Sequence, residues 1–198
     1  MCVRRAADWI EIVRYLETYA MLITAVAIVD EVLSAHRSVL GADFTSYRNH
    51  VYRVMNLCAR LPTDNVASRE KIAIAAVFHD LGIWTDGTFD YLEPSVRLAS
   101  TYLARSSREE WTAEIAEMIR EHHKITPYRG DAFPLVEPFR RADWTDVTLG
   151  VRRFGVSRAF LREIYAVWPD AGFHWRLVQL SLGRLRTNPR SPLPMVRW

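Results

Sequence analysis

Apolar side chains recur every three or four positions through most of the 198-residue chain, whereas the alternation typical of strands is nearly absent. This spacing predicts a first helix over residues 7–35 and a second that starts at Asp43 as its N-cap and ends near Leu61, before Pro62. The connections between helices are short, so the pattern favours an all-α bundle of mostly antiparallel helices. Further helices are expected over residues 68–79, 94–105, 107–123, 138 to beyond 143, 157–167 and 173–185.

Local signals mark several of the expected helix ends. Gly82 follows the third helix and is placed to end it, and Pro94 suits the first turn of the fourth. The run Ser107-Arg108-Glu109-Glu110 has the spacing of a capping box at the start of the fifth. Residues 188–194 contain three prolines, so we expect an extended tail there that lies along the body.

Two long connections, residues 85–93 and 125–137, are expected at the rim of a pocket, because loops of this length in a helical domain often carry function. Aromatic residues in these loops or directly before them either anchor the loops to the core or stack on a substrate. These residues are Trp84, Phe89, Tyr91 and Tyr128.

Composition excludes several classes of protein. Hydrophobic residues make up 49% of the chain and charged residues 25%, which excludes global disorder. The longest apolar run, residues 19–29, is shorter than the roughly 20 residues that span a bilayer, and the N-terminal residues lack the apolar region of a signal peptide. Cys2 and Cys58 are too few for a disulfide framework or a thiolate zinc site. We therefore expect a single cytoplasmic domain over residues 1–198, with no membrane partner.

Charge is distributed unevenly along the chain. The net charge is +3, but residues 1–150 carry 17 basic and 21 acidic residues, net −4, and residues 151–198 carry nine arginines and two acidic residues, net +7. The basic segment faces a phosphate, an anionic partner or the acidic part of its own chain. No nucleic-acid-binding motif is present, so a nucleic-acid partner is not expected, and the sequence carries no signal for oligomeric state.

Three histidines and one aspartate fall on the inward stripes of the expected helices. His50, His79 and His122 follow apolar residues at helical spacing, and Asp143 lies four residues after Phe139. A buried carboxylate needs a compensating charge. The set therefore indicates either a metal pocket inside the bundle, or core histidines whose hydrogen bonds are satisfied, with Asp143 paired to an arginine such as Arg53.

The adjacent pair His79-Asp80 adds to this pattern. Neighbouring residues in a helix point about 100° apart, so they can share an ion only near a helix end, which Leu81-Gly82 offers. With His50 before the pair and Asp143 after it, the order resembles that of the HD-domain superfamily of metal-dependent phosphohydrolases. Phe78-His79-Asp80-Leu81-Gly82 resembles that family's HD segment, Asn49-His50-Val51-Tyr52-Arg53-Val54 its first histidine helix, and Arg141-Ala142-Asp143-Trp144-Thr145-Asp146 its final aspartate motif.

The resemblance covers about residues 43–150 and implies a helical HD-type core, with flanking helices in 1–42 and 151–187 and an extended tail over 188–198. It also implies the metal ligands His50, His79, Asp80 and Asp143, with Asp146 competing for the place of Asp143. Two imidazoles and two carboxylates suit Mn, Fe, Co, Ni or Mg.

The same resemblance implies hydrolysis of a phosphate ester or nucleotide, a small anionic substrate, by a metal-activated water. The resemblance implies that Asp80 is both a metal ligand and a catalytic residue in that reaction. Lys124 or Arg53 offsets charge on the phosphoryl oxygens, although Lys124 alternatively faces solvent and Arg53 alternatively pairs with a carboxylate. His122 and His123 are implied in a second metal site or in substrate binding.

The sequence departs from the motifs of several HD-domain subgroups, which makes the reactions of those subgroups less expected. Lys124-Ile125-Thr126-Pro127 replaces the Gly-Tyr-Pro motif of second-messenger phosphodiesterases, and Leu81-Gly82-Ile83-Trp84 replaces the Glu-Asp pair of alarmone hydrolases. The di-iron oxygenase members carry two separated histidines where this chain has an adjacent pair. An HD-type hydratase or oxygenase acting on a small molecule, and a non-catalytic ligand-binding domain, stay as alternatives.

Overall fold

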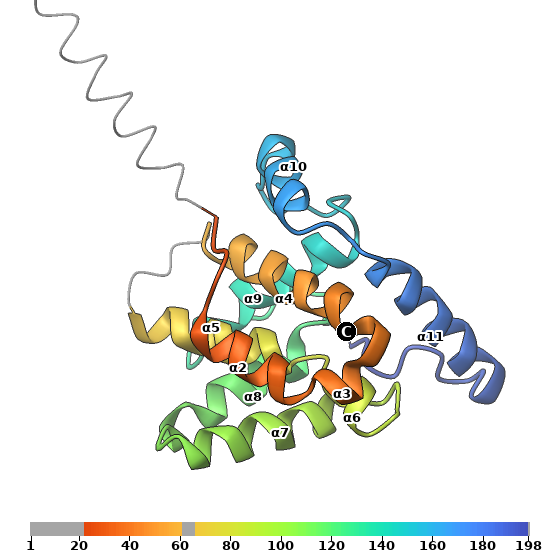
Figure 1. Ribbon diagram of the computed structural model, residues 1–198, viewed down its shortest axis with the longest axis horizontal. Helices are drawn as coiled ribbons and strands as arrows, with labels where there is room; N and C mark the ends of the chain where they lie inside the picture. Colours follow the sequence, from red (N-terminus) through yellow and green to blue (C-terminus); the bar gives the residue numbers. More distant parts are fainter. Residues whose placement is uncertain (1–21, 61–65, 198) are drawn as a thin grey trace, which may run out of the picture.

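The computed structural model describes residues 22–60 and 66–197, and the regular structure of these ranges is helical apart from one bridge between Lys124 and Arg197 (Figure 1). The predicted all-α fold is confirmed. The central helix α4 (Phe44–Cys58) packs between α5 (Val66–Phe78) and α9 (Val136–Val147).

The remaining helices surround this core. The antiparallel helices α7 and α8 pack on each other and against α5, and α2 also lies on α5. The helices α10 and α11 both contact α4. In Figure 1, α10 lies at the top of the view and α11 extends away from the body at the right. Their bounds are α2 Ala27–Ala35, α3 Arg37–Leu40, α6 Gly82–Thr85, α7 Leu92–Arg105, α8 Thr112–Glu121, α10 Arg158–Val167 and α11 Phe173–Thr187, with 3-10 turns at Gly41–Asp43 and Glu109–Trp111.

The central helix α4 is buried on nearly all sides, which explains its unusual polar content. His50, Arg53 and Asn56 recur every third residue and are all buried. A buried polar group is costly unless it is hydrogen-bonded, so this stripe must find partners. The Asn56 amide bonds both backbone groups of Ile23, at 2.8 and 3.0 Å, and His50 and Arg53 face the centre described below.

Gly82 does not end the third helix as predicted; it begins α6 instead. Its backbone needs no left-handed conformation. A Cβ at this position would lie 2.7 Å from the Tyr91 carbonyl oxygen and 2.8 Å from the Pro94 Cβ. Glycine is therefore required by the close approach of the chain entering α7.

The predicted capping box at Ser107 is also wrong. Ser107 adopts a positive φ of 54°, and the Arg108 amide bonds the Leu103 carbonyl at 3.0 Å. This six-residue closure is a Schellman-type end for α7, so the serine ends one helix rather than starting the next.

Other boundaries differ by a few residues. Of the predicted helix 7–35, positions 7–21 lie outside the described residues, 22–26 are not helical, and α2 begins at Ala27. The second helix ends at Cys58 rather than near Leu61, which is outside the described residues. Asp43 is its N-cap, but the Asp43 carboxylate accepts from Trp84 at 2.9 Å instead of capping.

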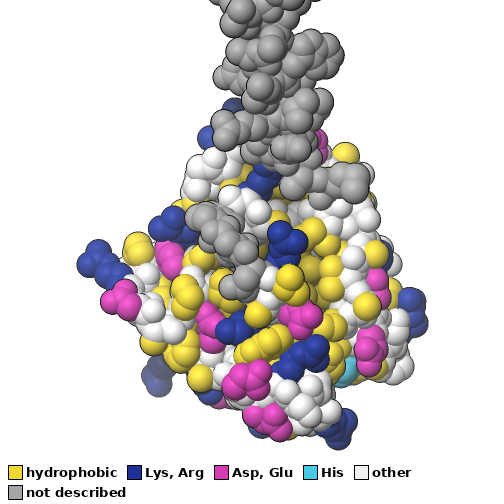
Figure 2. Space-filling model, turned by 90° about the vertical axis from the view of Figure 1, so that its left-hand side faces the viewer, with side chains coloured by type: hydrophobic (Ala, Val, Ile, Leu, Met, Phe, Trp, Pro, Cys, Tyr) yellow, Lys and Arg dark blue, Asp and Glu magenta, His cyan; other side chains and the backbone are white. Residues whose placement is uncertain are grey.

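The end of the C-terminal tail packs on the body, and residues 188–197 contain two turns, closed by the Ser191 amide on the Asn188 carbonyl and the Val196 amide on the Leu193 carbonyl. The Ile125 amide donates to the Arg197 carbonyl at 2.8 Å, and Met195 is buried in a small cluster with Ile83, Phe89, Tyr91 and Leu92. Within the described ranges no helix has the length and apolarity needed to cross a membrane. Figure 2 shows hydrophobic, basic and acidic side chains intermingled on one face, where hardly any histidine is visible.

Candidate metal centre

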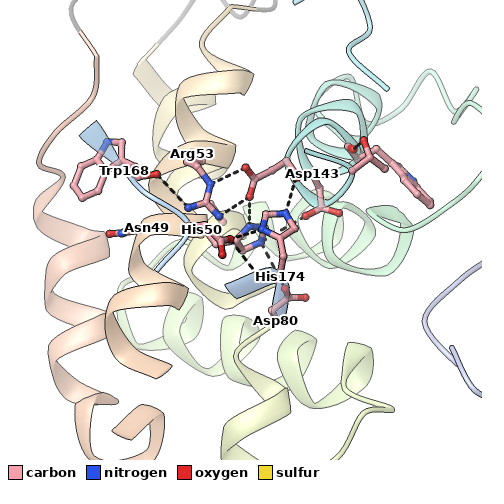
Figure 3. A network of polar contacts seen from close by, with 12 residues as sticks. Asn49, His50, Arg53, Asp80, Asp143, Trp168 and His174 are labelled. Carbon is pink, nitrogen blue, oxygen red and sulfur yellow. Dashed lines mark hydrogen bonds and ion pairs between the residues drawn. The ribbon is translucent and has the colours of Figure 1, made fainter. Parts of the chain in front are cut away.

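Histidine and aspartate side chains from four places in the fold converge inside the bundle. Figure 3 shows His50, Asp80 and Asp143 directed toward the same small region. Five of the six residues are buried, and the sixth, His123, has a side chain that is 11% exposed and is the one most open to solvent. The members are His50 in the middle of α4, His79 and Asp80 directly after α5, His122 and His123 directly after α8, and Asp143 on α9.

Helix ends explain how adjacent residues face one centre. His79 and Asp80 follow the last residue of α5, and His122 and His123 follow the last residue of α8. Leaving the helix releases the pair from the 100° separation of neighbouring helical side chains. The last carbonyls of a helix also lack backbone partners, and two of them accept hydrogen bonds from histidine Nδ1 atoms. The Ala76 carbonyl accepts from His79 at 2.7 Å, and the Ile119 carbonyl accepts from His122 at 2.6 Å.

The rings of His50 and His79 meet nitrogen to nitrogen, with their Nε2 atoms 2.9 Å apart. The Nδ1 of each ring already faces an acceptor, Asp146 at 2.7 Å for His50 and the Ala76 carbonyl for His79. Two neutral rings held this way would direct lone pairs at each other. A positive charge, either a proton or a cation, is therefore needed between them.

Carboxylate oxygens without hydrogen-bond partners face histidine nitrogens of the centre. Among the described residues, Asp80 Oδ1 and both carboxylate oxygens of Asp143 are buried without a hydrogen-bond partner. Asp80 Oδ1 lies 3.4 Å from His122 Nε2. Asp143 Oδ1 lies 3.6 Å from His50 Nε2, and Asp143 Oδ2 lies 3.3 Å from His123 Nδ1. Buried acceptors without donors are rare and costly, and carboxylate oxygens with imidazole nitrogens are suitable ligands for a divalent metal. The residues present therefore fit a metal ion.

Protonation in this cluster is strongly perturbed. Burial lowers the pKa of His79, but the carboxylates of Asp80 and Asp143 outweigh it and raise that pKa to about 9. Burial, together with the nearby His123, lowers the pKa of His122 to about 4. Although burial opposes it, the surrounding histidines hold the pKa of the Asp80 and Asp143 carboxyls below the ordinary value. The centre thus holds two carboxylates that stay ionised.

The ligand atoms form two groups that share Asp80. His50, His79 and Asp80 offer atoms within 4.8 Å of one another, and so do Asp80, His122 and His123. Tyr91, the N-cap residue of α7, borders the second group: its hydroxyl lies 2.9 Å from His123 Nε2 and 3.4 Å from His122 Nε2.

Asp146, the alternative to Asp143, has a different place. Its carboxylate accepts from His50 Nδ1 and from the Nε and Nη2 atoms of Arg53, at 2.7, 2.7 and 2.9 Å. Arg53 and the bound His50 lower the pKa of Asp146 despite its burial. Asp143 faces the Nε2 side of His50 and Asp146 its Nδ1 side. Arg53 is fully buried and pairs with Asp146 rather than with Asp143. Its expected role on a phosphoryl group stays a prediction.

Lys124 follows the histidine pair and lies at the edge of the centre. Its ammonium is 3.4 Å from Glu121. Its carbonyl accepts from buried Arg140 and from Trp144, both at 2.9 Å. These two residues of α9 fix the turn that carries His122 and His123.

The sequence reasoning missed the contribution of the C-terminal helices. Tyr165 of α10 donates to Asp146 Oδ1 at 2.8 Å, and Phe173 at the start of α11 stacks on His50 with ring centroids 4.0 Å apart. Neither residue stands near the motifs in the chain. The inward placement of Ile164 and Phe173 on amphipathic helices was the available signal, and it indicated only packing.

A sequence model of the HD domain matches residues 47–148, just over half of the chain. The chain belongs to the HD-domain family. No curated protein and no solved structure matches it. The HD match contains every histidine and aspartate of the centre, and it leaves α2, α10 and α11 outside.

Proposed function

We propose that this HD-domain protein is a metal-dependent hydrolase of small phosphate esters or nucleotides. The observation that carries the proposal is that several groups of the centre require a positive charge. Two imidazole nitrogens lie 2.9 Å apart, and three buried carboxylate oxygens have no hydrogen-bond partner among the described residues. Membership of a family associated with metal-dependent phosphohydrolases supports the reaction class.

His50, His79, Asp80 and Asp143 would hold one divalent ion, and Asp80 would share a second with His122 and His123. The mixture of imidazole and carboxylate donors suits Mn, Fe, Co, Ni or Mg. A divalent ion bound there supplies a hydroxide nucleophile at neutral pH and polarises a phosphoryl oxygen.

The residues of the chain orient and shield this chemistry. The Nδ1 bonds of His50, His79 and His122 keep their Nε2 atoms directed inward. Burial of the surrounding groups excludes water, which strengthens their electrostatic interactions. His123 is the most exposed member of the centre, so we place the approach of the substrate beside His123 and Lys124, where the lysine ammonium offsets phosphate charge.

The experiment compares the wild type with His79→Gln and Asp80→Asn in metal content and in turnover of a panel of phosphomonoesters, phosphodiesters and nucleotides. We expect stoichiometric metal and turnover of at least one ester in the wild type, and loss of both in the variants. His36→Gln is the matched control, because His36 bonds the Val32 carbonyl on α2 outside the centre. Substoichiometric metal after loading with each of the five metals, or equal turnover in the variants, contradicts the proposal.

A second candidate is oxidation of a small molecule at two metals. The adjacent residues His122 and His123 both reach Asp80, so a two-metal centre does not require separated histidines. Oxygen consumption by the iron-loaded protein, without hydrolysis of any ester, would favour this reaction. Metal binding without either activity would favour a ligand-binding role.

A further inference from the structure

His50 differs from the other buried histidines in how its ring is oriented. His79 and His122 stand at helix ends and donate Nδ1–H to carbonyls three residues earlier. His50 lies in the middle of α4, where the carbonyls are occupied by the helix itself. Its Nδ1 therefore needs an acceptor from elsewhere, and Asp146 provides it at 2.7 Å.

Asp146 is held on its other sides by Arg53 and Tyr165. Arg53 binds both carboxylate oxygens, at 2.7 and 2.9 Å, and its Nη1 continues to the Pro169 carbonyl at 3.1 Å. The Tyr165 hydroxyl donates to Oδ1 at 2.8 Å. With His50, three side chains thus donate to one fully buried carboxylate, and its position is fixed from three directions.

The residues that complete this arrangement lie outside the part of the chain matched by the HD domain. Tyr165, Pro169 and Phe173 belong to the segment that forms α10, α11 and the loop between them, beyond residue 148. Phe173 covers the face of the His50 ring at an interplanar angle of 13°. The ring is thereby fixed in tilt by stacking and in rotation by its Nδ1 bond.

We propose that Asp146, held by Arg53 and Tyr165, is a positioning residue that fixes the tautomer and orientation of His50 for metal binding, and that α10 and α11 complete the metal centre in this chain. The inference rests on the metal centre of the proposed function. A carboxylate that accepts from the distal nitrogen of a metal-binding histidine fixes the tautomer and raises the basicity of the ligand nitrogen.

The test measures the affinity of the chelator-treated full chain for Mn²⁺ by isothermal titration calorimetry. Asp146→Asn should bind Mn²⁺ about 10- to 100-fold more weakly than the wild type. Tyr165→Phe should show a smaller loss of the same sign, because it removes only the hydrogen bond that holds Asp146. Urea denaturation of each metal-free variant shows whether the fold is intact, and Tyr165→Phe decides the outcome if Asp146→Asn does not fold.

Tyr52→Phe is the matched control. The Tyr52 hydroxyl is another tyrosine donor to an aspartate, bonding Asp30 at 2.8 Å outside the histidine cluster. Its loss should lower stability and leave Mn²⁺ affinity unchanged. Wild-type affinity in both Asp146→Asn and Tyr165→Phe, or an equal loss in Tyr52→Phe, overturns the inference. A wild type without Mn²⁺ binding overturns the inference together with the metal centre, whereas Mn²⁺ binding without ester hydrolysis overturns the hydrolase alone.

Discussion

In the metal-free protein, His79 should stay protonated at neutral pH and lose its proton only near pH 9. Its pKa is raised to about 9 because the carboxylates of Asp80 and Asp143 outweigh the cost of burial, and this proton supplies the positive charge needed beside His50. In the unfolded chain a histidine titrates near pH 6.5. The folded state therefore binds one more proton than the unfolded state between these two values.

The sign and size of the effect follow from this difference. When folding raises the pKa of a group, the group stabilises the folded state, and this stabilisation is fully present at pH values below its pKa in the unfolded chain. The stabilisation is lost as the pH rises through the pKa of the group in the folded protein. One proton changes the free energy of unfolding by about 1.4 kcal/mol per pH unit. Between pH 6.5 and 8.5, the metal-free protein should therefore lose about 2 to 3 kcal/mol from His79 alone.

Urea denaturation of the chelator-treated protein at half-unit pH steps measures this loss. The range stops at pH 8.5 because an unfolded thiol is about half ionised at that pH, whereas burial raises the pKa of the Cys58 thiol in the folded state. Above pH 8.5 this second difference in proton binding would add to the loss. His79→Gln should lack the dependence, and the wild type loaded with metal should lack it too, since a metal ligand is already deprotonated. Equal pH slopes for the metal-free wild type and His79→Gln would refute the reasoning.

Two further predictions concern packing around the centre. Gly82→Ala should lower the free energy of unfolding by about 1–3 kcal/mol, because its Cβ would lie 2.7 Å from the Tyr91 carbonyl oxygen. Gly183 lies in open space on α11, so Gly183→Ala should be neutral or stabilising. Equal changes in the free energy of unfolding for the two variants, measured by urea denaturation, would contradict this prediction. Met195→Ala should loosen the tail and speed hydrogen exchange at the Ile125 amide, which donates to the Arg197 carbonyl; unchanged exchange measured by NMR would show that Met195 does not anchor it.

Local spacing was sufficient to predict the longer described helices and the inward side chains, but not the short helices α3 and α6. His50, His79, His122 and Asp143 were placed on inward stripes by their distance from apolar neighbours, and all four are buried. These placements depend on a period of 3.6 residues, which is a property of the chain itself. Their roles as metal ligands stay predictions.

Features that depend on tertiary approach could not be predicted in this way. Gly82 follows a helix, as a terminating glycine does, yet its requirement comes from the Tyr91 backbone nine residues later. Tyr165 and Phe173 reach His50 and Asp146 only because α10 and α11 pack against α4, and no periodicity in those helices identifies which polar group they meet. Asp143 and Asp146 are three residues apart on one helix, and only the tertiary position of Arg53 gives them different partners.

The pairing of Arg197 with Ile125 has a practical consequence for anyone who produces this protein. Ile125 is two positions beyond His123, so Arg197 lies beside the turn that carries the most exposed histidine of the metal centre. A polyhistidine purification tag at that end would bring extra imidazoles to the neighbourhood and compete for the same ions. Measurements of metal content are therefore best made on protein from which such a tag has been cleaved.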